Sequence, residues 1–92
     1  MKNVLRVTKL YDWQELSKSI AWYRRSFNLT QLEFAKLINV DNSKVSRWES
    51  GQTQPKAEDV VNAARLFGIS EQDLLHPSGE VKKWMNRSLE EA

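Results

Sequence analysis

The sequence predicts an all-α fold, a compact domain of five short helices followed by an extra amphipathic helix at the carboxyl end. Apolar residues recur at spacings of three and four along most of the chain, which is the period of a helix with one buried face. Residues that cap helices stand before several of these runs, and asparagine or glycine stands after them. A chain of 92 residues buries one hydrophobic core, so we expect a binding module rather than a protein with a deep substrate cavity.

The composition is that of an ordinary globular protein, with 40% hydrophobic and 28% charged residues. Lys and Arg number 14 against 12 Asp and Glu, so the net charge of +2 is in itself weak evidence for a nucleic-acid partner. The chain contains no cysteine, which excludes disulfides and thiolate metal sites. No apolar run is long enough for a signal peptide or a membrane span, and we expect a soluble cytoplasmic protein.

The chain divides into an amino-terminal arm or strand (1–11), a helical domain (12–75), and a carboxyl-terminal linker with an amphipathic helix (76–92). Apolar and polar residues alternate in the first segment, and basic residues are interspersed among them. This pattern leaves four interpretations open: an edge strand, a strand that pairs in a dimer, a basic arm, or a poorly ordered terminus.

The first predicted helix begins at Asp12, because Asp12 and Glu15 form a capping-box pair. It ends near Asn28, a residue type that tolerates the left-handed conformation found just past many helices. The apolar residues of this helix share one predicted buried face: Trp13, Leu16, Ile20, Tyr23 and Phe27.

A second capping box, Thr30 with Glu33, opens a helix that is too short to be stable without neighbours. We therefore expect it to pack against the rest of the domain. Its inward face consists of three residues: Phe34, Ala35 and Ile38.

A tight turn at Asn39 and Val40 separates this helix from a third one. We expect the carboxylate of Asp41 to cap the third helix, which runs over 42–50 and ends at Gly51.

Two further helices complete the domain. A polar loop over 52–56 leads to the fourth, which Gly68 ends, and Ser70 caps a fifth that runs to Leu75. The last segment carries an apolar stripe, which either covers the core or forms a two-fold dimer interface. The stripe consists of Val81, Trp84, Met85 and Leu89.

The third helix has one apolar and one polar face. At 100° per residue, Val45 and Trp48 lie opposite an arc of about 140° that holds only polar residues. These residues are Asn42, Ser43, Ser46, Arg47 and Ser50. Two short helices joined by a tight turn form a helix-turn-helix, whose second helix enters the major groove of DNA. A polar face by itself does not indicate DNA binding, because any surface helix has one. The capped helix and the tight turn that precede this helix favour the interpretation that it contacts DNA.

The polar face suits contact with base edges. An asparagine can bind adenine through two hydrogen bonds, an arginine can bind guanine in the same way, and serine side chains are short enough for close approach. We expect base contacts from Asn42, Ser43, Ser46 and Arg47, with Arg47 as the main determinant of specificity.

From about Ile20 to Leu75 the sequence resembles the Cro/CI-type repressor family, also called the XRE helix-turn-helix family. The motifs that carry the resemblance are Tyr23-Arg24, Leu29-Thr30-Gln31-x-Glu33-Phe34-Ala35, Val45-Ser46-Arg47-Trp48-Glu49-x-Gly51, Pro55, Ala64-x-x-Phe67-Gly68-Ile69-Ser70 and Leu74-Leu75. The resemblance implies a lambda-repressor-like fold and a transcriptional regulator, specifically a repressor, that binds double-stranded DNA. It also implies a homodimer on a palindromic operator, with half-sites about 34 Å apart.

The resemblance assigns further roles. Gln31 would contact the DNA backbone from a helix amino terminus, which is suited to phosphate. Arg24 and Glu49 would form a partly buried, structural salt bridge between the first helix and the end of the third. The remaining residues expected to meet phosphates are Lys44, Gln52, Thr53, Gln54 and Lys56.

The chain departs from the family pattern at a few positions. Asn28 and Asn39 stand where glycine is common, and left-handed geometry tolerates asparagine there. Lys56 stands where a capping serine is frequent, which leaves the fourth helix without an obvious cap.

A protein-interaction module is the alternative from another functional class. The same fold serves in antitoxins that neutralise a toxin and in phage antagonists, and the partner surface would then lie in 1–19 and 76–92. We expect no enzyme, no cofactor and no metal site. Helix caps account for Asp12, Glu33 and Asp41, and the single histidine, His76, stands beside a proline in a loop.

Overall fold

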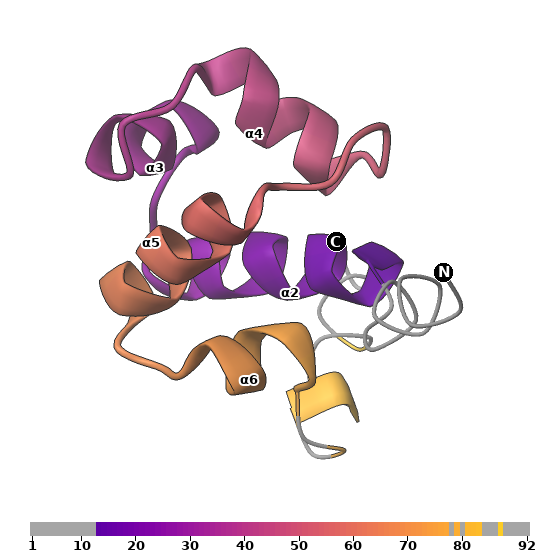
Figure 1. Ribbon diagram of the computed structural model, residues 1–92. Coiled ribbons are helices and arrows are strands. Elements are labelled where there is room, and N and C mark those ends of the chain that lie inside the picture. Colours follow the sequence, from indigo (N-terminus) through magenta and orange to yellow (C-terminus); the bar gives the residue numbers. More distant parts are fainter. Residues whose placement is uncertain (1–12, 78, 80, 84–86, 88–92) are drawn as a thin grey trace, which may run out of the picture.

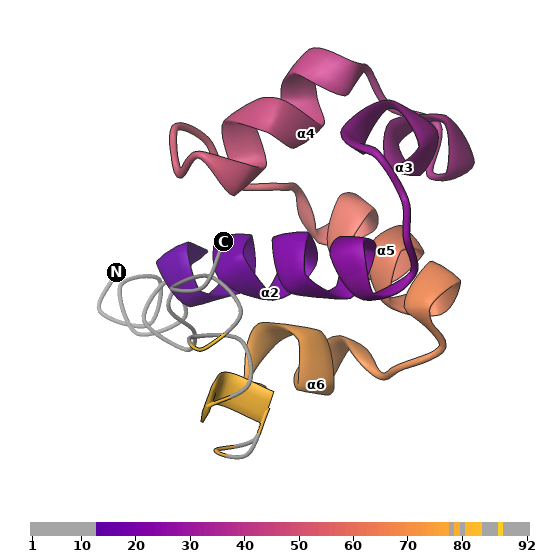
Figure 2. The same ribbon diagram turned by 180° about the vertical axis from the view of Figure 1, so that it is seen from behind.

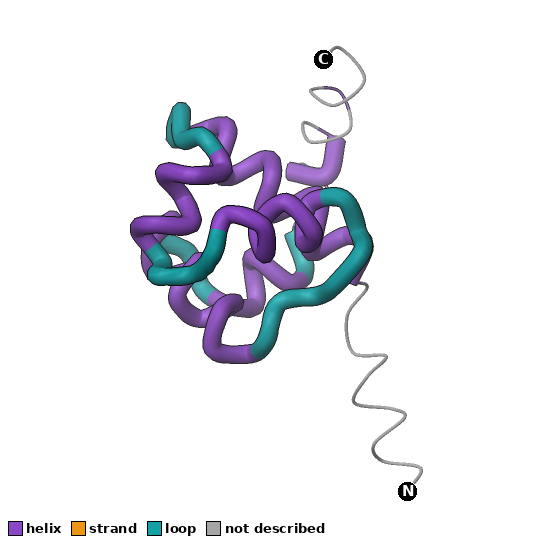
Figure 3. The backbone as a smooth tube through the Cα atoms, turned by 90° about the horizontal axis from the view of Figure 1, so that it is seen from above, coloured by secondary structure: helices purple, strands orange, loops and turns teal. Residues whose placement is uncertain are grey.

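The structure, a computed structural model, describes residues 13–77, 79, 81–83 and 87. In this part of the chain there are helices and no strand, as the tube view shows (Figure 3). Five helices form the domain: α2 (Trp13–Ser26), α3 (Gln31–Leu37), α4 (Asn42–Glu49), α5 (Ala57–Phe67) and α6 (Glu71–Leu75). The predicted all-α fold class is confirmed.

Several predictions fall outside the described residues. They are the amino-terminal arm or strand (1–11), the cap at Asp12, and the part of the carboxyl-terminal stripe formed by Trp84, Met85 and Leu89.

Helix α2 runs through the middle of the domain (Figures 1 and 2). Helices α3 and α4 lie on one side of it, and α6 lies on the opposite side. Helix α2 contacts α4, α5 and α6, while α3 packs chiefly against α4. The pair α3 and α4 is therefore carried on one side of the domain by a central helix.

An aromatic cluster around Phe67 of α5 joins three of the helices. Its ring stacks on Phe34 of α3, with 5.4 Å between the ring centroids and 8° between the planes, and on Tyr23 of α2, also at 5.4 Å. The side chain of Phe34 is fully buried. Each such pair contributes about 0.5–1.5 kcal/mol beyond the burial of its area, so the cluster fixes α3 relative to α2 and α5.

The prediction that Phe27 lies on the buried face was wrong, because the residue is 49% exposed. Helix α2 ends at Ser26, so Phe27 no longer follows the helical face that buries Leu16 and Ile20. One side of its ring still contacts Phe67, with 5.5 Å between the centroids.

Local signals fix the start of α3 and the turns on either side of it. Thr30 caps the helix through its Oγ1, which accepts from the N–H of Glu33 at 3.0 Å, and Glu33 accepts in return from the N–H of Thr30 at 2.8 Å. Asn28 and Asn39 adopt φ angles of 57° and 60° in the left-handed region. The predicted capping box and both asparagine turns are confirmed.

Two other caps differ from the prediction. Asp41 is the N-cap residue of α4, but its carboxylate makes no capping hydrogen bond. Its backbone carbonyl already accepts from the N–H of Lys44 at 3.0 Å, so the amide that a carboxylate would cap has a partner. The sequence showed no cap for helix α5. In the structure a residue of its first turn supplies one: the carboxylate of Asp59 accepts from the N–H of Lys56, the N-cap residue, at 3.1 Å.

A salt bridge joins the carboxyl-terminal segment to α2. Residues 81–83 are helical, and Lys82 lies 3.1 Å from the carboxylate of Glu15. Both side chains are partly exposed, so the pair contributes at most about 1 kcal/mol.

Among the side chains of the described residues, the hydroxyl of Ser19 is the buried polar group that lacks a hydrogen-bond partner. A buried hydroxyl without a partner costs about 1–3 kcal/mol. We expect Ser19→Ala to raise the free energy of unfolding by about 1 kcal/mol, measured by urea denaturation. Ser46→Ala, at an exposed helical position, controls for helix propensity. A Ser19→Ala variant that is less stable than the parent would contradict the assignment.

The capping box of α3 should make the stability of the fold depend on pH in the acidic range. The pKa of Glu33 lies below its ordinary value, first because the backbone N–H of Thr30 donates to its carboxylate and second because of the Thr30 side chain. A carboxyl group whose pKa is lower in the folded state stabilises the fold at pH values above its unfolded-state pKa of 4.5. This stabilisation is lost as the pH falls through the folded-state pKa. We expect Glu33→Gln to flatten the decline in melting temperature between neutral pH and about pH 3. Parallel curves for parent and variant would show that the capping carboxylate is not involved.

Candidate nucleic-acid interface

Helix α4 divides into the two faces that the sequence predicts. Val45 is fully buried and Trp48 is 3% exposed. The residues of the polar face are all exposed: Asn42, Ser43, Ser46, Arg47 and Ser50. The helix thus presents an uninterrupted polar surface to solvent while two apolar side chains hold it on the core.

The turn between α3 and α4 has a defined backbone. The N–H of Val40 donates to the carbonyl of Ala35 at 2.9 Å, and Asn39 supplies the left-handed residue that reverses the chain. Because the turn is closed by backbone hydrogen bonds, the angle between the two helices is fixed. Helices α3 and α4 accordingly lie together at the edge of the domain (Figure 2).

The loop after α4 folds back onto the end of that helix. Gly51 has a φ of 80°, in the region that favours glycine, and the N–H groups of Gln52 and Thr53 both donate to the carbonyl of Arg47, at 2.9 and 3.3 Å. The side chains expected to meet phosphates from this loop are exposed: Gln52, Thr53 and Gln54. The loop therefore lies directly beside the polar face.

The two lysines expected to meet phosphates are exposed and share one polar hollow of about 210 Å³. Lys44 of α4 and Lys56 before α5 line it together with Glu58 and Asp59. Two carboxylates thus offset the two ammonium groups, and this part of the surface is less basic than the lysines alone would suggest.

A buried ion pair ties α4 to α2. The guanidinium of Arg24 donates to both oxygens of Glu49, from Nε to Oε2 at 2.6 Å and from Nη2 to Oε1 at 2.9 Å. It also donates from Nη1 to the carbonyl of Leu29 at 2.7 Å. Only 10% of the Arg24 side chain and 7% of the Glu49 side chain are exposed. The pair that the resemblance implied is therefore present, and it holds both the end of α4 and the chain before α3.

Gln31 is half-buried and joins this cluster, which the sequence did not indicate. Its Nε2 donates to Oε1 of Glu49 at 3.0 Å. The side chain that was expected to meet the DNA backbone is thus hydrogen-bonded to the carboxylate that pairs with Arg24.

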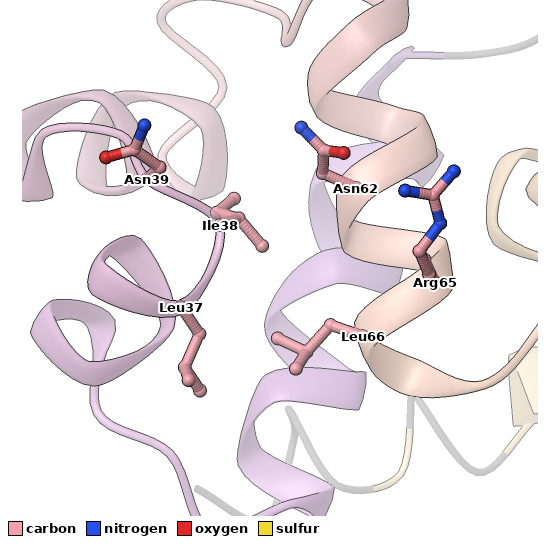
Figure 4. Close-up of a pocket in the computed structure, with 6 residues that line it drawn as sticks. All are labelled: Leu37, Ile38, Asn39, Asn62, Arg65 and Leu66. Carbon is pink, nitrogen blue, oxygen red and sulfur yellow. The ribbon is translucent and has the colours of Figure 1, made fainter.

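A hollow of about 360 Å³ lies between the end of α3 and α5 (Figure 4). It is lined by Leu37, Ile38, Asn39, Asn62, Arg65 and Leu66. This lining offers alkyl groups, two amides and a guanidinium, and it contains no carboxylate, imidazole or hydroxyl that could serve as a base or nucleophile.

Among the described residues, no three His, Asp or Glu side chains come together as a metal site would require. None of the helices in this part combines the length and the apolar character needed to cross a membrane.

Helix α3, the turn after it and α4 form a helix-turn-helix unit, carried by α2, α5 and α6 in a lambda-repressor-like fold. The model of the helix-turn-helix family matches residues 20–74, more than half of the chain. The chain belongs to the Cro/CI-type, or XRE, helix-turn-helix family.

Two curated relatives and one solved structure illustrate the similarity. The chain is 30% identical over 60 residues to the antitoxin PezA of Streptococcus pneumoniae serotype 4, which covers 65% of this chain and 38% of PezA. It is 32% identical over 66 residues to the HTH-type transcriptional activator BcrR of Enterococcus faecalis, which covers 72% of this chain and 31% of BcrR. The chain thus spans about a third of the length of these relatives. Its fold is similar to that of the P22 c2 repressor in complex with a synthetic operator, with a TM-score of 0.64 and 24% identity over 68% of this chain and 96% of that one.

The Arg24–Glu49 pair should be essential to stability. Arg24→Ala leaves a buried carboxylate and the carbonyl of Leu29 without their partner, and we expect the free energy of unfolding to fall by about 3–5 kcal/mol in urea denaturation followed by circular dichroism. The double variant Arg24→Met/Glu49→Leu removes both charges and should recover most of the loss. An Arg24→Ala variant that unfolds at the urea midpoint of the parent would show that the pair does not tie the helices together.

Proposed function

We propose that this chain binds double-stranded DNA sequence-specifically, as a transcriptional repressor, with α4 in the major groove. The observation that carries the proposal is the exposed polar face of α4, a helix that Val45 and Trp48 hold against the core within a helix-turn-helix. An α-helix fits the width of the major groove, where each base pair has its own pattern of donors and acceptors.

Four side chains of this face read base edges in the proposed complex. Asn42 can bind adenine through its amide, and Arg47 can bind guanine through two parallel hydrogen bonds. Ser43 and Ser46 are short and allow the helix to come close to the bases. Arg47 is the main determinant of specificity.

The remaining polar residues contact the DNA backbone. Gln31 donates to phosphate from the start of α3, and a second group contacts phosphates from α4 and the loop after it: Lys44, Gln52, Thr53, Gln54 and Lys56. Because Glu58 and Asp59 offset the lysines and the net charge is only +2, the affinity is modest and falls steeply with salt.

The relatives support regulation of transcription and differ in its sign. The P22 c2 repressor binds an operator, whereas BcrR is an activator. We further propose that the chain acts in the cytoplasm as a homodimer on a palindromic operator.

A second candidate function is that of an antitoxin that binds a protein toxin. It is favoured by the 30% identity to the antitoxin PezA. Purification of the chain with a stoichiometric protein partner would support it.

The proposal is tested by selecting bound sequences from a randomised duplex library with the parent and with Arg47→Ala. We expect the parent to enrich a palindromic site and Arg47→Ala to lose about 1–3 kcal/mol of discrimination at one base pair. Arg65→Ala is the matched control, since it removes an exposed arginine of α5 that lines the hollow between α3 and α5. Enrichment of no sequence by the parent would refute the proposal.

A further inference from the structure

The carboxylate of Glu49 accepts hydrogen bonds from two side chains that come from different helices. Its Oε2 accepts from Nε of Arg24 at 2.6 Å, and its Oε1 accepts both from Nη2 of Arg24 at 2.9 Å and from Nε2 of Gln31 at 3.0 Å. Three donors thus converge on one largely buried carboxylate at the end of α4.

This arrangement fixes the orientation of the Gln31 amide. Turning the amide by 180° would place its oxygen against a carboxylate oxygen, where two acceptors repel each other. The nitrogen therefore faces Glu49. An amide nitrogen carries two hydrogens, and one of them remains available to donate to a ligand, because Gln31 is only half-buried.

The charge of the cluster matters as well. A carboxylate beside a phosphate-binding group would repel the phosphate if its charge were uncompensated. Arg24 holds Glu49 in an ion pair with two hydrogen bonds, so the carboxylate orients Gln31 without adding net negative charge at this position.

We propose that Glu49 is a positioning residue for DNA binding: it holds the Gln31 amide so that the second N–H of that amide donates to a backbone phosphate. This rests on the proposed function. A side chain ordered before binding loses less freedom when the complex forms, so the benefit of Glu49 to affinity comes through Gln31.

The binding test is a double-variant cycle with Gln31→Ala and Glu49→Gln, by fluorescence anisotropy on the selected site and on a random duplex. We expect each single variant to lose roughly threefold to tenfold in affinity on both duplexes, since a phosphate contact carries no sequence information. The double variant should lose no more affinity than the single variant that binds DNA more weakly. Gln52→Ala is the matched control, because no hydrogen bond joins Gln52 to Glu49, and its loss in affinity should add to that of Glu49→Gln.

Two outcomes separate the two proposals. Additive losses of Gln31→Ala and Glu49→Gln would overturn the positioning role and leave DNA binding intact, because a purely structural Glu49 lowers stability without coupling to Gln31. Failure of the parent to bind any duplex would overturn the proposed function, and the positioning role with it.

A measurement on the parent protein covers the case in which Glu49→Gln does not fold. In ¹⁵N relaxation experiments, we expect the side-chain amide of Gln31 to be nearly as ordered as the backbone, and that of the exposed Gln52 to be mobile. Equal mobility of the two side chains would overturn the proposal.

Discussion

The position of helix α4 depends on one buried carboxylate. Glu49 is the last residue of α4, and Arg24 reaches it from the centre of the domain with two hydrogen bonds. Burying a carboxylate that is only 7% exposed costs free energy unless a partner such as Arg24 pairs with it. The start of α4 is held by the turn after α3, and the end is held by this pair. The interaction that completes the fold therefore also sets the direction in which the polar face points.

The local part of this architecture could be predicted from the sequence, because its causes lie within a few residues. Thr30 and Glu33 cap each other across three positions, and Asn39 needs only its own left-handed conformation to make the turn. The division of α4 follows from helical period alone, which places Val45 and Trp48 on the same side. The polar face opposite them could be predicted without knowing which helices pack against α4.

The rest depends on contacts between helices and on where the backbone of each helix begins and ends, which the spacing of residues does not reveal. The bond between Gln31 and Glu49 joins residues 18 positions apart and exists only because α3 and α4 pack together. The exposure of Phe27 follows from where α2 ends. The carboxylate of Asp41 makes no capping hydrogen bond, because the N–H of Lys44 already donates to the backbone carbonyl of Asp41. In each case the outcome depends on the folded geometry, which the residue type alone does not show.

In the proposed complex, the exposed face of α4 is the surface that meets DNA. The decisive experiment is a titration of the ¹⁵N-labelled protein with a selected duplex, followed in ¹H–¹⁵N correlation spectra. We expect the largest changes in chemical shift on 42–50 and on the loop over 51–54, while α6 (Glu71–Leu75) on the opposite side of α2 changes little. Shifts centred on α5 and α6, with α4 unchanged, would contradict it.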